Sequence, residues 1–405
     1  MLVSATVATG FFLASAASSL DLNEDLRTRF DYGADLLLVE GRPPGAPAHL
    51  GPGLGEAGVG LNSPASPYVN FPADLHLASP GVEAAARLWR GEALLVGATI
   101  RPVAVYAVSP DEFAGVAWWR DDFADAPLVD LLDALRGGNG AIVSGDLLAE
   151  NGHSPGSSLQ LRFGPDDDGA GGPPYTDLRV TVTGSADLFP THRPDSGSFV
   201  IVDLRRLMLE IGERPWDVLG RRAPDSDLQE VLAGFAAQDL PVLSAHDVAA
   251  ELQRLRADPL RVGVFGVLSV GFAWILLLAL ILFIYQAALT FRRRRPQVGI
   301  LRATGMSSFQ LARWLATENS LSGALSVVAG LGVGAITAWF FLIMLEVAVG
   351  GATRAPAFQV AVEWERALQF AGIALAGMVA AALVSFVAAR RVDLHQAIQL
   401  ADEQY

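Results

Sequence analysis

Long stretches without a charged side chain lie on either side of mixed, polar sequence in this chain. Residues 262–291, 319–345 and 367–389 contain no Asp, Glu, Lys or Arg and consist mainly of aliphatic, aromatic and small residues. A helix rises ~1.5 Å per residue, so that about 20 apolar residues cross a ~30 Å hydrocarbon core. The pattern therefore predicts transmembrane helices over 261–291, 318–349 and 366–389.

The first 20 residues are also uncharged, and two interpretations are open. One is a secretory signal, because Ala14-Ser15-Ala16 would suit a signal peptidase, although no basic residue precedes the apolar run as is usual for a signal. The other is a first transmembrane helix over 1–20 whose cytoplasmic start is short or missing. We favour the helix because it agrees with the topology that the arginines predict.

Arginines near helix ends mark the cytoplasmic side of a membrane. Arg292 to Arg295 follow the second predicted helix, and Arg390-Arg391 follow the fourth. A cytoplasmic segment over 292–317, an external loop over 350–365 and a cytoplasmic tail over 390–405 result, with residues 21–260 outside. The predicted fold class is an α-helical membrane protein in the cell (plasma or inner) membrane. Its four transmembrane helices carry a large extracytoplasmic α/β domain between the first and the second.

The extracytoplasmic domain alternates between strand and helix patterns. Short apolar or alternating runs predict strands over 36–39, 93–96, 101–108, 141–143, 159–163, 179–183 and 199–202. Apolar residues at helical spacing predict helices over 128–135, 204–211, 227–237 and 245–256, besides one after 141–143. Pro259 can kink the last of these or begin the next helix. Gly and Pro mark 41–68 and 164–174 as flexible loops.

Composition narrows the chemistry. The chain is 51% hydrophobic and 18% charged with a net charge of −14, and acidic residues outnumber arginines before position 257 but not after it. An acidic external domain argues against binding nucleic acid, whose phosphates would be repelled. The absence of cysteine excludes disulfides and thiolate chemistry. No lysine is present, which excludes a P-loop ATPase and a Schiff-base enzyme in this chain.

No catalytic, metal or cofactor site is predicted. The histidines lack metal-ligand spacing, and Asp166-Asp167-Asp168 lacks the spacing of a calcium loop. Residues 152–156 match the G-x-S-x-G motif, but Pro155 follows the serine and has no N–H for an oxyanion hole. That match predicts a turn before the 159–163 strand. The Trp118-Trp119 pair is interpreted as part of the core rather than as a ligand platform.

The segment before the third predicted membrane helix carries the most informative pattern. Pro296 can open a helix over 297–304, Gly305 can end it, and Ser307 to Gln310 has the S-x-x-Q form of a capping box. Such a short helix does not fold alone, and it exposes Val298, Ile300, Leu301 and Met306. Two interpretations are open at this point: an interfacial helix on anionic lipid, or a docking surface for a cytoplasmic protein.

Residues 295–306, Arg-Pro-Gln-Val-Gly-Ile-Leu-Arg-Ala-Thr-Gly-Met, resemble the FtsX-like domain of MacB-type ABC transporter permeases. Gln310, Leu311, Glu318 and a Gly-rich helix follow, as in that family. The chain has Gln297 where the family usually has an acid, and Thr304 where it has an aliphatic residue. Three short motifs in the predicted external domain also resemble large members of the family. They are Tyr32-Gly33-Ala34-Asp35, Asp187-Leu188-Phe189-Pro190 and Asp258-Pro259.

The resemblance implies a permease subunit whose external domain moves when a separate nucleotide-binding subunit hydrolyses ATP, so that ATP and Mg²⁺ bind to the partner and no cofactor binds here. Such movement would export or extract a lipid, lipoprotein, peptide or drug-like substrate. The resemblance assigns the contact with the ATPase to Arg295, Val298, Ile300, Leu301, Arg302, Thr304, Gly305 and Met306.

A single unit of this kind must pair with a second permease subunit or half, as a homodimer, a heterodimer or part of a longer permease. Gly330 and Gly334 permit close helix contact, either in packing within one unit or in a dimer seam. Membrane lipids and an external protein are further expected partners. The alternatives are an FtsX-like regulator that acts on an external cell-wall hydrolase, and a membrane-anchored sensor or binding protein without an ATPase.

Overall fold

The computed structural model divides the chain into two compact units. The helical unit comprises Met1–Asn23, Arg256–Ala352 and Phe358–Tyr405, and the α/β unit comprises Glu24–Leu255 and Thr353–Ala357. The residues that the structure describes are 2–40, 73–97, 99–151, 154–164, 175–212, 214–238, 240, 242–293, 304–345, 355–362, 364–365, 368–369, 371–373, 375–377 and 379–380. The predicted loops over 41–68 and 164–174 lie outside them, apart from Gly164.

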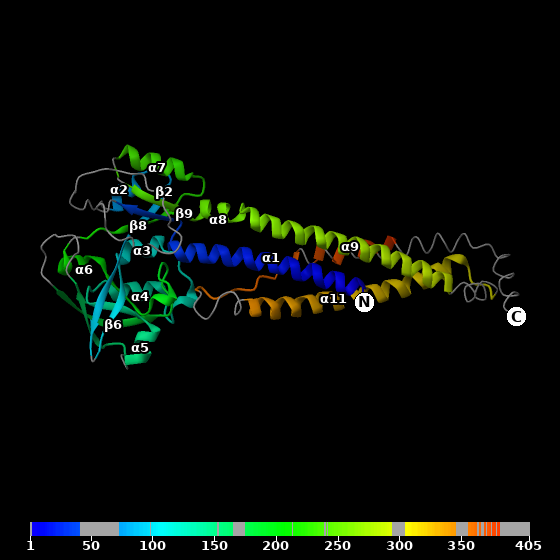
Figure 1. Cartoon of the computed structure of the whole chain (residues 1–405), viewed down its shortest axis with the longest axis horizontal. Helices are drawn as coiled ribbons and strands as arrows, with labels where there is room; N and C mark the ends of the chain where they lie inside the picture. The colour runs from blue at the N-terminus through cyan, green and yellow to red at the C-terminus, as the bar shows by residue number, and fades with distance from the viewer. Residues whose placement is uncertain are drawn as a thin grey trace. The chain divides into compact units, whose positions relative to one another are not determined.

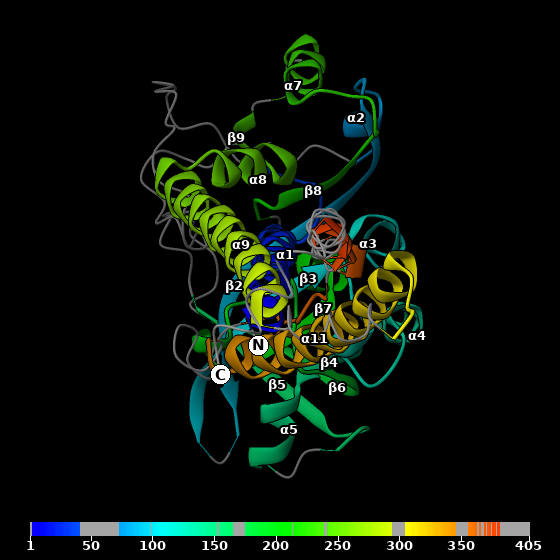
Figure 2. The same cartoon turned by 90° about the vertical axis from the view of Figure 1, so that its right-hand side faces the viewer.

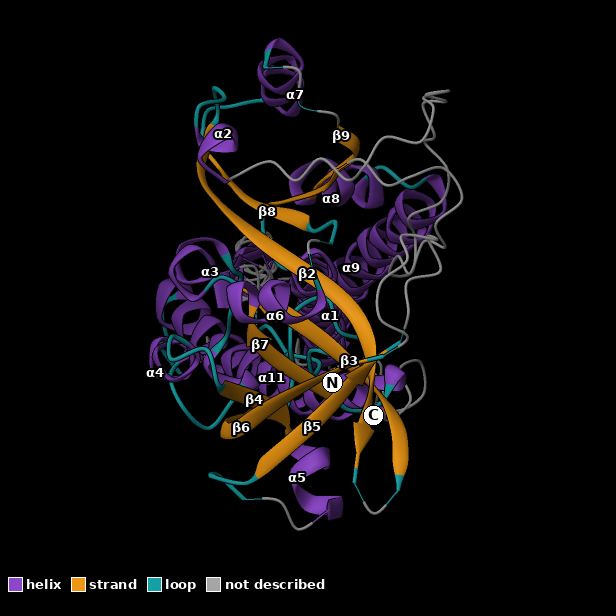
Figure 3. Ribbon diagram, turned by 90° about the vertical axis from the view of Figure 1, so that its left-hand side faces the viewer, coloured by secondary structure: helices purple, strands orange, loops and turns teal. Residues whose placement is uncertain are grey.

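The described part of the α/β unit is built on a nine-stranded sheet in the order β3-β7-β4-β6-β5-β2-β8-β1-β9. Because β2 also pairs with β3, the strands from β3 through β2 form a closed ring, and β8, β1 and β9 extend from it. Figure 3 shows β2 as one long strand shared by both parts. The strands are β1 (Leu36–Glu40), β2 (Val82–Val96), β3 (Ile100–Val108), β4 (Gly140–Ser144), β5 (Ser158–Phe163), β6 (Thr176–Ala186), β7 (Phe199–Asp203), β8 (Asp217–Arg222) and β9 (Val242–Asp247).

Hydrophobic patterning explains these strands. Strand β4 is buried along its whole length, as is most of β7, in agreement with their continuous apolar sequences. Strand β5 alternates between buried and more exposed residues because only one of its faces meets the core. One apolar cluster, which includes Val105, Leu161 and Val200, draws on all the strands of the ring.

Helices cover the sheet on several sides. They are α2 (Ala73–Leu77), α3 (Pro110–Val116), α4 (Leu128–Leu135), α5 (Gly145–Asn151), α6 (Leu204–Ile211), α7 (Leu228–Ala237) and α8 (Val248–Arg256). Helix α6 begins where Asp203 accepts a hydrogen bond from the Arg206 N–H at 2.8 Å. A second cluster packs α3 and α4 against the sheet, whereas α7 packs Val231 and Phe235 on β1 and β8. In Figures 2 and 3, α7 and α5 lie at opposite ends of this unit.

The sequence-based prediction of this unit is right in most elements, but several boundaries differ. The strand predicted over 93–96 begins eleven residues earlier, at Val82. Helices α4 and α6 have the predicted bounds. The helix predicted over 245–256 is wrong at its start, because residues 245–247 belong to β9 and α8 begins at Val248. Pairing of β9 with β1 overrides the helical pattern of these residues. Strand β8 and helices α2 and α3 had no sequence prediction.

The helical unit contains α9 (Pro259–Arg293), α11 (Ser308–Leu345) and the first part of α1 (Leu2–Tyr32), all labelled in Figure 1. Helix α1 continues beyond the predicted end at residue 20 to Tyr32, and its last turns belong to the α/β unit. Helix α9 begins at Pro259, which lacks the N–H that the first turn would leave unpaired. Rings from α1 pack edge to face on Trp364 and Phe341.

Two of the described helices are long and apolar enough to cross a membrane, over Ser4–Tyr32 and Leu321–Phe341. In α9 the corresponding apolar stretch is shorter, Ser269–Leu282. Residues 381–405 and several positions of the helix predicted over 366–389 lie outside the described residues. The prediction of four spans therefore stays a prediction.

Candidate coupling site

The corner before α11 has the local structure that its sequence predicts. Gly305 adopts a φ of 98°, a conformation that favours glycine. The Gln310 N–H donates to Ser307 Oγ at 3.2 Å, and the Ser307 N–H donates to Gln310 Oε1 at 3.0 Å. This reciprocal pair confirms the predicted capping box. Thr304 and Gly305 are exposed beside it, and Met306 is half-buried.

The other residues assigned to the ATPase contact are not described. Arg295, Val298, Ile300, Leu301 and Arg302 lie outside the residues that the structure describes. The short helix predicted over 297–304 therefore stays a prediction. What the structure contributes is the exposed corner at its predicted end, which leads directly into α11.

Gly330 and Gly334 of α11 lie against α1 of the same chain. A Cβ atom added at Gly330 would lie 2.6 Å from the Ser4 carbonyl oxygen, and one added at Gly334 would lie 2.9 Å from the Ala8 carbonyl oxygen. Both distances are shorter than real Cβ contacts, so these glycines let two helix backbones approach closely. The contact takes place within one helical unit, and the dimer seam stays an untested prediction.

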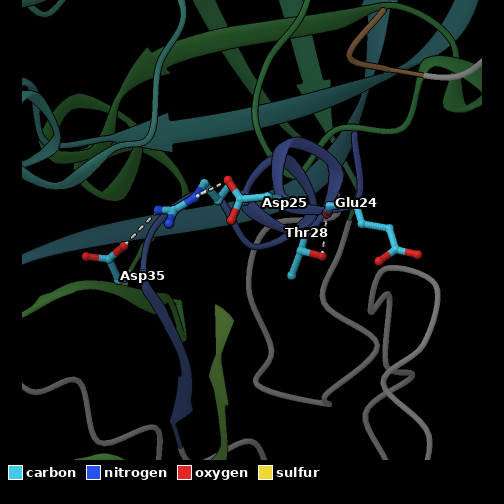
Figure 4. A network of polar contacts seen from close by, with 5 residues as sticks. Glu24, Asp25, Thr28 and Asp35 are labelled. Carbon is cyan, nitrogen blue, oxygen red and sulfur yellow. Dashed lines mark hydrogen bonds and ion pairs between the residues drawn. The ribbon is translucent and has the colours of Figure 1, made fainter. Parts of the chain in front are cut away.

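The last turns of α1 are fixed to the start of β1 by an arginine. Arg29 Nε donates to Asp25 Oδ2 at 3.0 Å, and Arg29 Nη1 donates to Asp35 Oδ1 at 3.3 Å (Figure 4). On the same turn, Thr28 Oγ1 donates to the Glu24 carbonyl at 2.8 Å. Gly33 turns the chain between helix and strand with a φ of 74°. The Tyr32-Gly33-Ala34-Asp35 motif thus lies between the end of α1 and the start of β1.

A loop from Asp187 to Gly197 receives the end of α1. The Thr191 N–H donates to the Phe30 carbonyl at 2.7 Å, and Gly33 lies so close that a Cβ there would be 2.9 Å from Thr191 Cγ2. His192 holds this loop: its Nδ1 is 3.0 Å from the Tyr106 hydroxyl, and its Nε2 is 2.9 Å from the Gly197 carbonyl. Burial lowers the pKa of His192 and raises the pKa of Tyr106.

The start of α8 is fixed at the same place as the end of α1. The Val248 N–H donates to the Asp35 carbonyl at 3.0 Å. The ring of His246, from β9, stacks on Tyr32, with centroids 5.6 Å apart and an interplanar angle of 8°. We call this meeting point of Tyr32, Asp35, His246 and Val248 the Asp35 junction. It joins the end of α1, through which the chain enters the α/β unit, to the start of α8, through which the chain leaves it.

Buried ion pairs stiffen the sheet around the Asp35 junction. Asp217 of β8 is 2% exposed and pairs with Arg90 of β2. Asp247 of β9 is 6% exposed and lies 2.7 Å from Arg222 Nη1. Removing one partner of such a pair would leave a buried charge without compensation, which typically costs about 3–5 kcal/mol. The pairs therefore favour one register of β2, β8 and β9.

The remaining candidate motifs show no catalytic geometry among the described residues. Residues 155–156 form a turn before β5, as predicted. Among all the residues that the structure describes, no group of three or more His, Asp or Glu could hold a metal ion. Trp118 and Trp119 both pack edge to face on Phe123, which agrees with the core interpretation. Asp166-Asp167-Asp168 lies outside the described residues.

Residues 269–393 match the family described as FtsX-like permease C-terminal. This match confirms the resemblance inferred from residues 295–306: this range is similar to a family of membrane-integral permeases. No curated protein matches the chain.

Two solved structures show distant likeness. The extracellular domain of the noncanonic ABC-type transporter YknZ from Gram-positive bacteria is 11% identical with a TM-score of 0.29, covering 43% of this chain and 86% of that one. The periplasmic region of MacB from Actinobacillus actinomycetemcomitans is 8% identical with a TM-score of 0.35, covering 56% and 95%. Both TM-scores are low, and the description of the α/β unit therefore relies on its own strands and helices.

Helix packing predicts opposite outcomes for two nearby glycines. Gly330→Ala should lower the stability of the full chain by about 1–3 kcal/mol, because its Cβ meets the backbone of α1. Gly332→Ala is the matched control, since nothing lies within 4 Å of its Cβ, and it should be neutral or stabilise by up to about 1 kcal/mol. Thermal unfolding in detergent measures both. Equal melting temperatures would contradict the packing.

His192 predicts a pH dependence of stability. Its pKa in the folded chain lies below the value of ~6.5 in the unfolded chain, so the unfolded state binds the proton first. The stabilisation is fully present above pH ~6.5 and falls below it, with a limiting slope of about 1.4 kcal/mol per pH unit. His192→Gln keeps a donor and an acceptor but does not titrate. Its unfolding free energy should therefore depend less on pH between 7 and 5, and parallel pH profiles would refute the assignment.

Proposed function

We propose, from the premise that residues 269–393 resemble an FtsX-like permease domain, that this chain is the permease subunit of an ABC transporter. A separate ATPase subunit would hydrolyse ATP, and the permease would pass the resulting motion to the α/β unit outside the membrane. The match over 269–393 carries this proposal, because that range contains the corner at Gly305, all of α11 and most of α9. The lack of lysine supports it, since this chain has no residue for a Walker motif.

Two features of the described residues support a mechanical role. The corner at Thr304 and Gly305 is exposed and held by a capping box, so that a force applied there acts directly on α11. In the α/β unit, the end of α1 and the start of α8 are fixed at the Asp35 junction by a hydrogen bond, a ring stack and an ion pair. A rigid attachment of this kind transmits displacement, whereas a flexible linker would absorb it.

These helices favour a mechanism of export in which the substrate does not pass through a polar channel. The part of α11 from Leu321 to Phe341 contains no ionisable residue, and intramembrane ionisable residues are the usual marks of an ion or proton path. We therefore propose that movement of the external unit extracts or expels a lipid, lipoprotein, peptide or apolar drug. The substrate class is set by whatever the external unit contacts.

The docking of the ATPase predicts a specific loss of function. Leu301→Asp should lower the stimulation of partner ATPase activity at least about tenfold, because burying a leucine contributes about 1.5–3 kcal/mol and tenfold corresponds to 1.4 kcal/mol. Leu209→Asp on α6 is the matched control, since this leucine is 74% exposed in the α/β unit. The measurement is ATP hydrolysis by the copurified complex in nanodiscs.

Membrane insertion of both variants should equal that of the unchanged chain. Normal stimulation by Leu301→Asp would overturn the docking role. Identification of the partner by mass spectrometry after pull-down in mild detergent distinguishes the three functions. An ATPase with an exporter phenotype supports the proposal, copurification of a cell-wall hydrolase supports the regulator, and no ATPase at all supports the sensor.

A further inference from the structure

An extended segment of the helical unit, residues 358–362, is hydrogen-bonded to side chains of α1. The Gln359 N–H donates to Asn23 Oδ1 at 2.8 Å, and Asn23 Nδ2 donates to the Gln359 carbonyl at 2.7 Å. The asparagine amide thus pairs with the backbone as a neighbouring strand would. Asn23 is 3% exposed, so both bonds form away from water.

Ser19 repeats this arrangement one helical turn earlier. The Ala361 N–H donates to Ser19 Oγ at 2.9 Å, and Ser19 Oγ lies 3.2 Å from the Ala361 carbonyl oxygen. The serine side chain is fully buried. Four residues of helix rise ~6 Å and two residues of extended chain span ~6.6 Å. The spacing of Ser19 and Asn23 therefore matches the spacing of Ala361 and Gln359, and the two pairs fix one register.

Apolar contacts cover the same segment. Phe358 and Val360 pack in a cluster with Phe11 of α1 and Ala338 of α11. Further along, the Trp364 ring meets Phe11 edge to face at 5.7 Å. Successive residues of an extended chain alternate in direction, so that 358 and 360 meet the helices while the backbone of 359 and 361 pairs with α1. The segment is held by polar and apolar contacts at once.

Backbone groups that are buried away from water are costly to leave unpaired. Asn23 pairs with both the N–H and the carbonyl of Gln359. Ser19 Oγ accepts from the Ala361 N–H, and its one hydrogen lies within donor distance of the Ser15 carbonyl at 2.7 Å and the Ala361 carbonyl at 3.2 Å. Separation of α1 from this segment would break the bonds to Gln359 and Ala361 together. The arrangement has the character of a permanent joint rather than of a contact that slides.

We propose that Ser19 and Asn23 are positioning residues that fasten the 358–362 connector to α1, so that α1 and the connector move as one body through the ATP cycle. The connector follows α11 in sequence, and the joint therefore prevents α1 from moving independently of the helix that carries the coupling corner. This inference rests on the proposed function in so far as it concerns the ATP cycle. The existence of the joint does not depend on the proposed function.

An engineered disulfide tests the joint in the full chain. The chain has no cysteine, so Ser19→Cys with Ala361→Cys introduces the only two thiols. The cross-link should form equally in the chain alone, in the complex with its ATPase, and in the complex trapped with ATP and vanadate. The cross-linked complex should keep its ATPase stimulation. The proposal is overturned if no cross-link forms in the chain alone, or if the yield of the cross-link is about tenfold lower in a trapped state. It is also overturned if the cross-linked complex loses its ATPase stimulation and a reductant restores it.

A second variant tests the importance of the amide. Asn23→Leu keeps a similar volume but loses every bond to Gln359, and should lower ATPase stimulation about tenfold or more. Thr9→Val is the matched control, because among the described residues the Thr9 hydroxyl bonds to the Ala5 carbonyl of its own helix and not to the 358–362 segment. Full stimulation by Asn23→Leu would overturn the role of the joint. If the unaltered chain stimulates no ATPase, the proposed function fails, and the cross-link in the chain alone still decides whether the joint exists.

Discussion

The hydrogen bond from the Val248 N–H to the Asp35 carbonyl, at 3.0 Å, joins the end of the chain segment that enters the α/β unit through α1 to the start of α8, through which the chain leaves it. Arg29 adds a charged contact to the carboxylate of the same aspartate, and the stacked rings of Tyr32 and His246 close the junction from the side. Because both segments end on neighbouring strands, β1 and β9, a displacement of either one acts on the sheet and not on a loop. The proposed mechanical role depends on this arrangement.

In the helical unit, small and polar side chains of α1 serve the same purpose. Gly330 and Gly334 bring α11 into backbone contact with α1, and Ser19 and Asn23 hold the 358–362 segment on another part of its surface. A helix whose serine, asparagine and small residues are buried by protein is expected at the centre of a membrane bundle. The exposed large apolar residues lie instead on helices such as α9, for example Trp274 and Tyr285.

The sequence predicts those features that follow from a local pattern. The capping box at Ser307 and the bounds of α4 and α6 depend on residues next to one another, and the structure confirms them. Strand β9 was missed because pairing with β1 is a non-local interaction that outweighs helical periodicity. The contacts of Asn23 were beyond prediction for the same reason: the partner is a backbone group more than 300 positions away, which leaves no trace in side-chain identity. The Gly330–Gly334 pattern indicated a close contact, and only the structure identifies α1 as its partner.

The central claim is that the Thr304 corner lies in the cytoplasm while the α/β unit lies outside, so that force passes from one side of the membrane to the other. Single cysteines at Thr304, exposed at the corner, and at Val129, 60% exposed on α4, test it directly in this cysteine-free chain. A membrane-impermeant maleimide should label position 129 in intact cells and position 304 only after permeabilisation. Labelling of position 304 in intact cells would contradict the account.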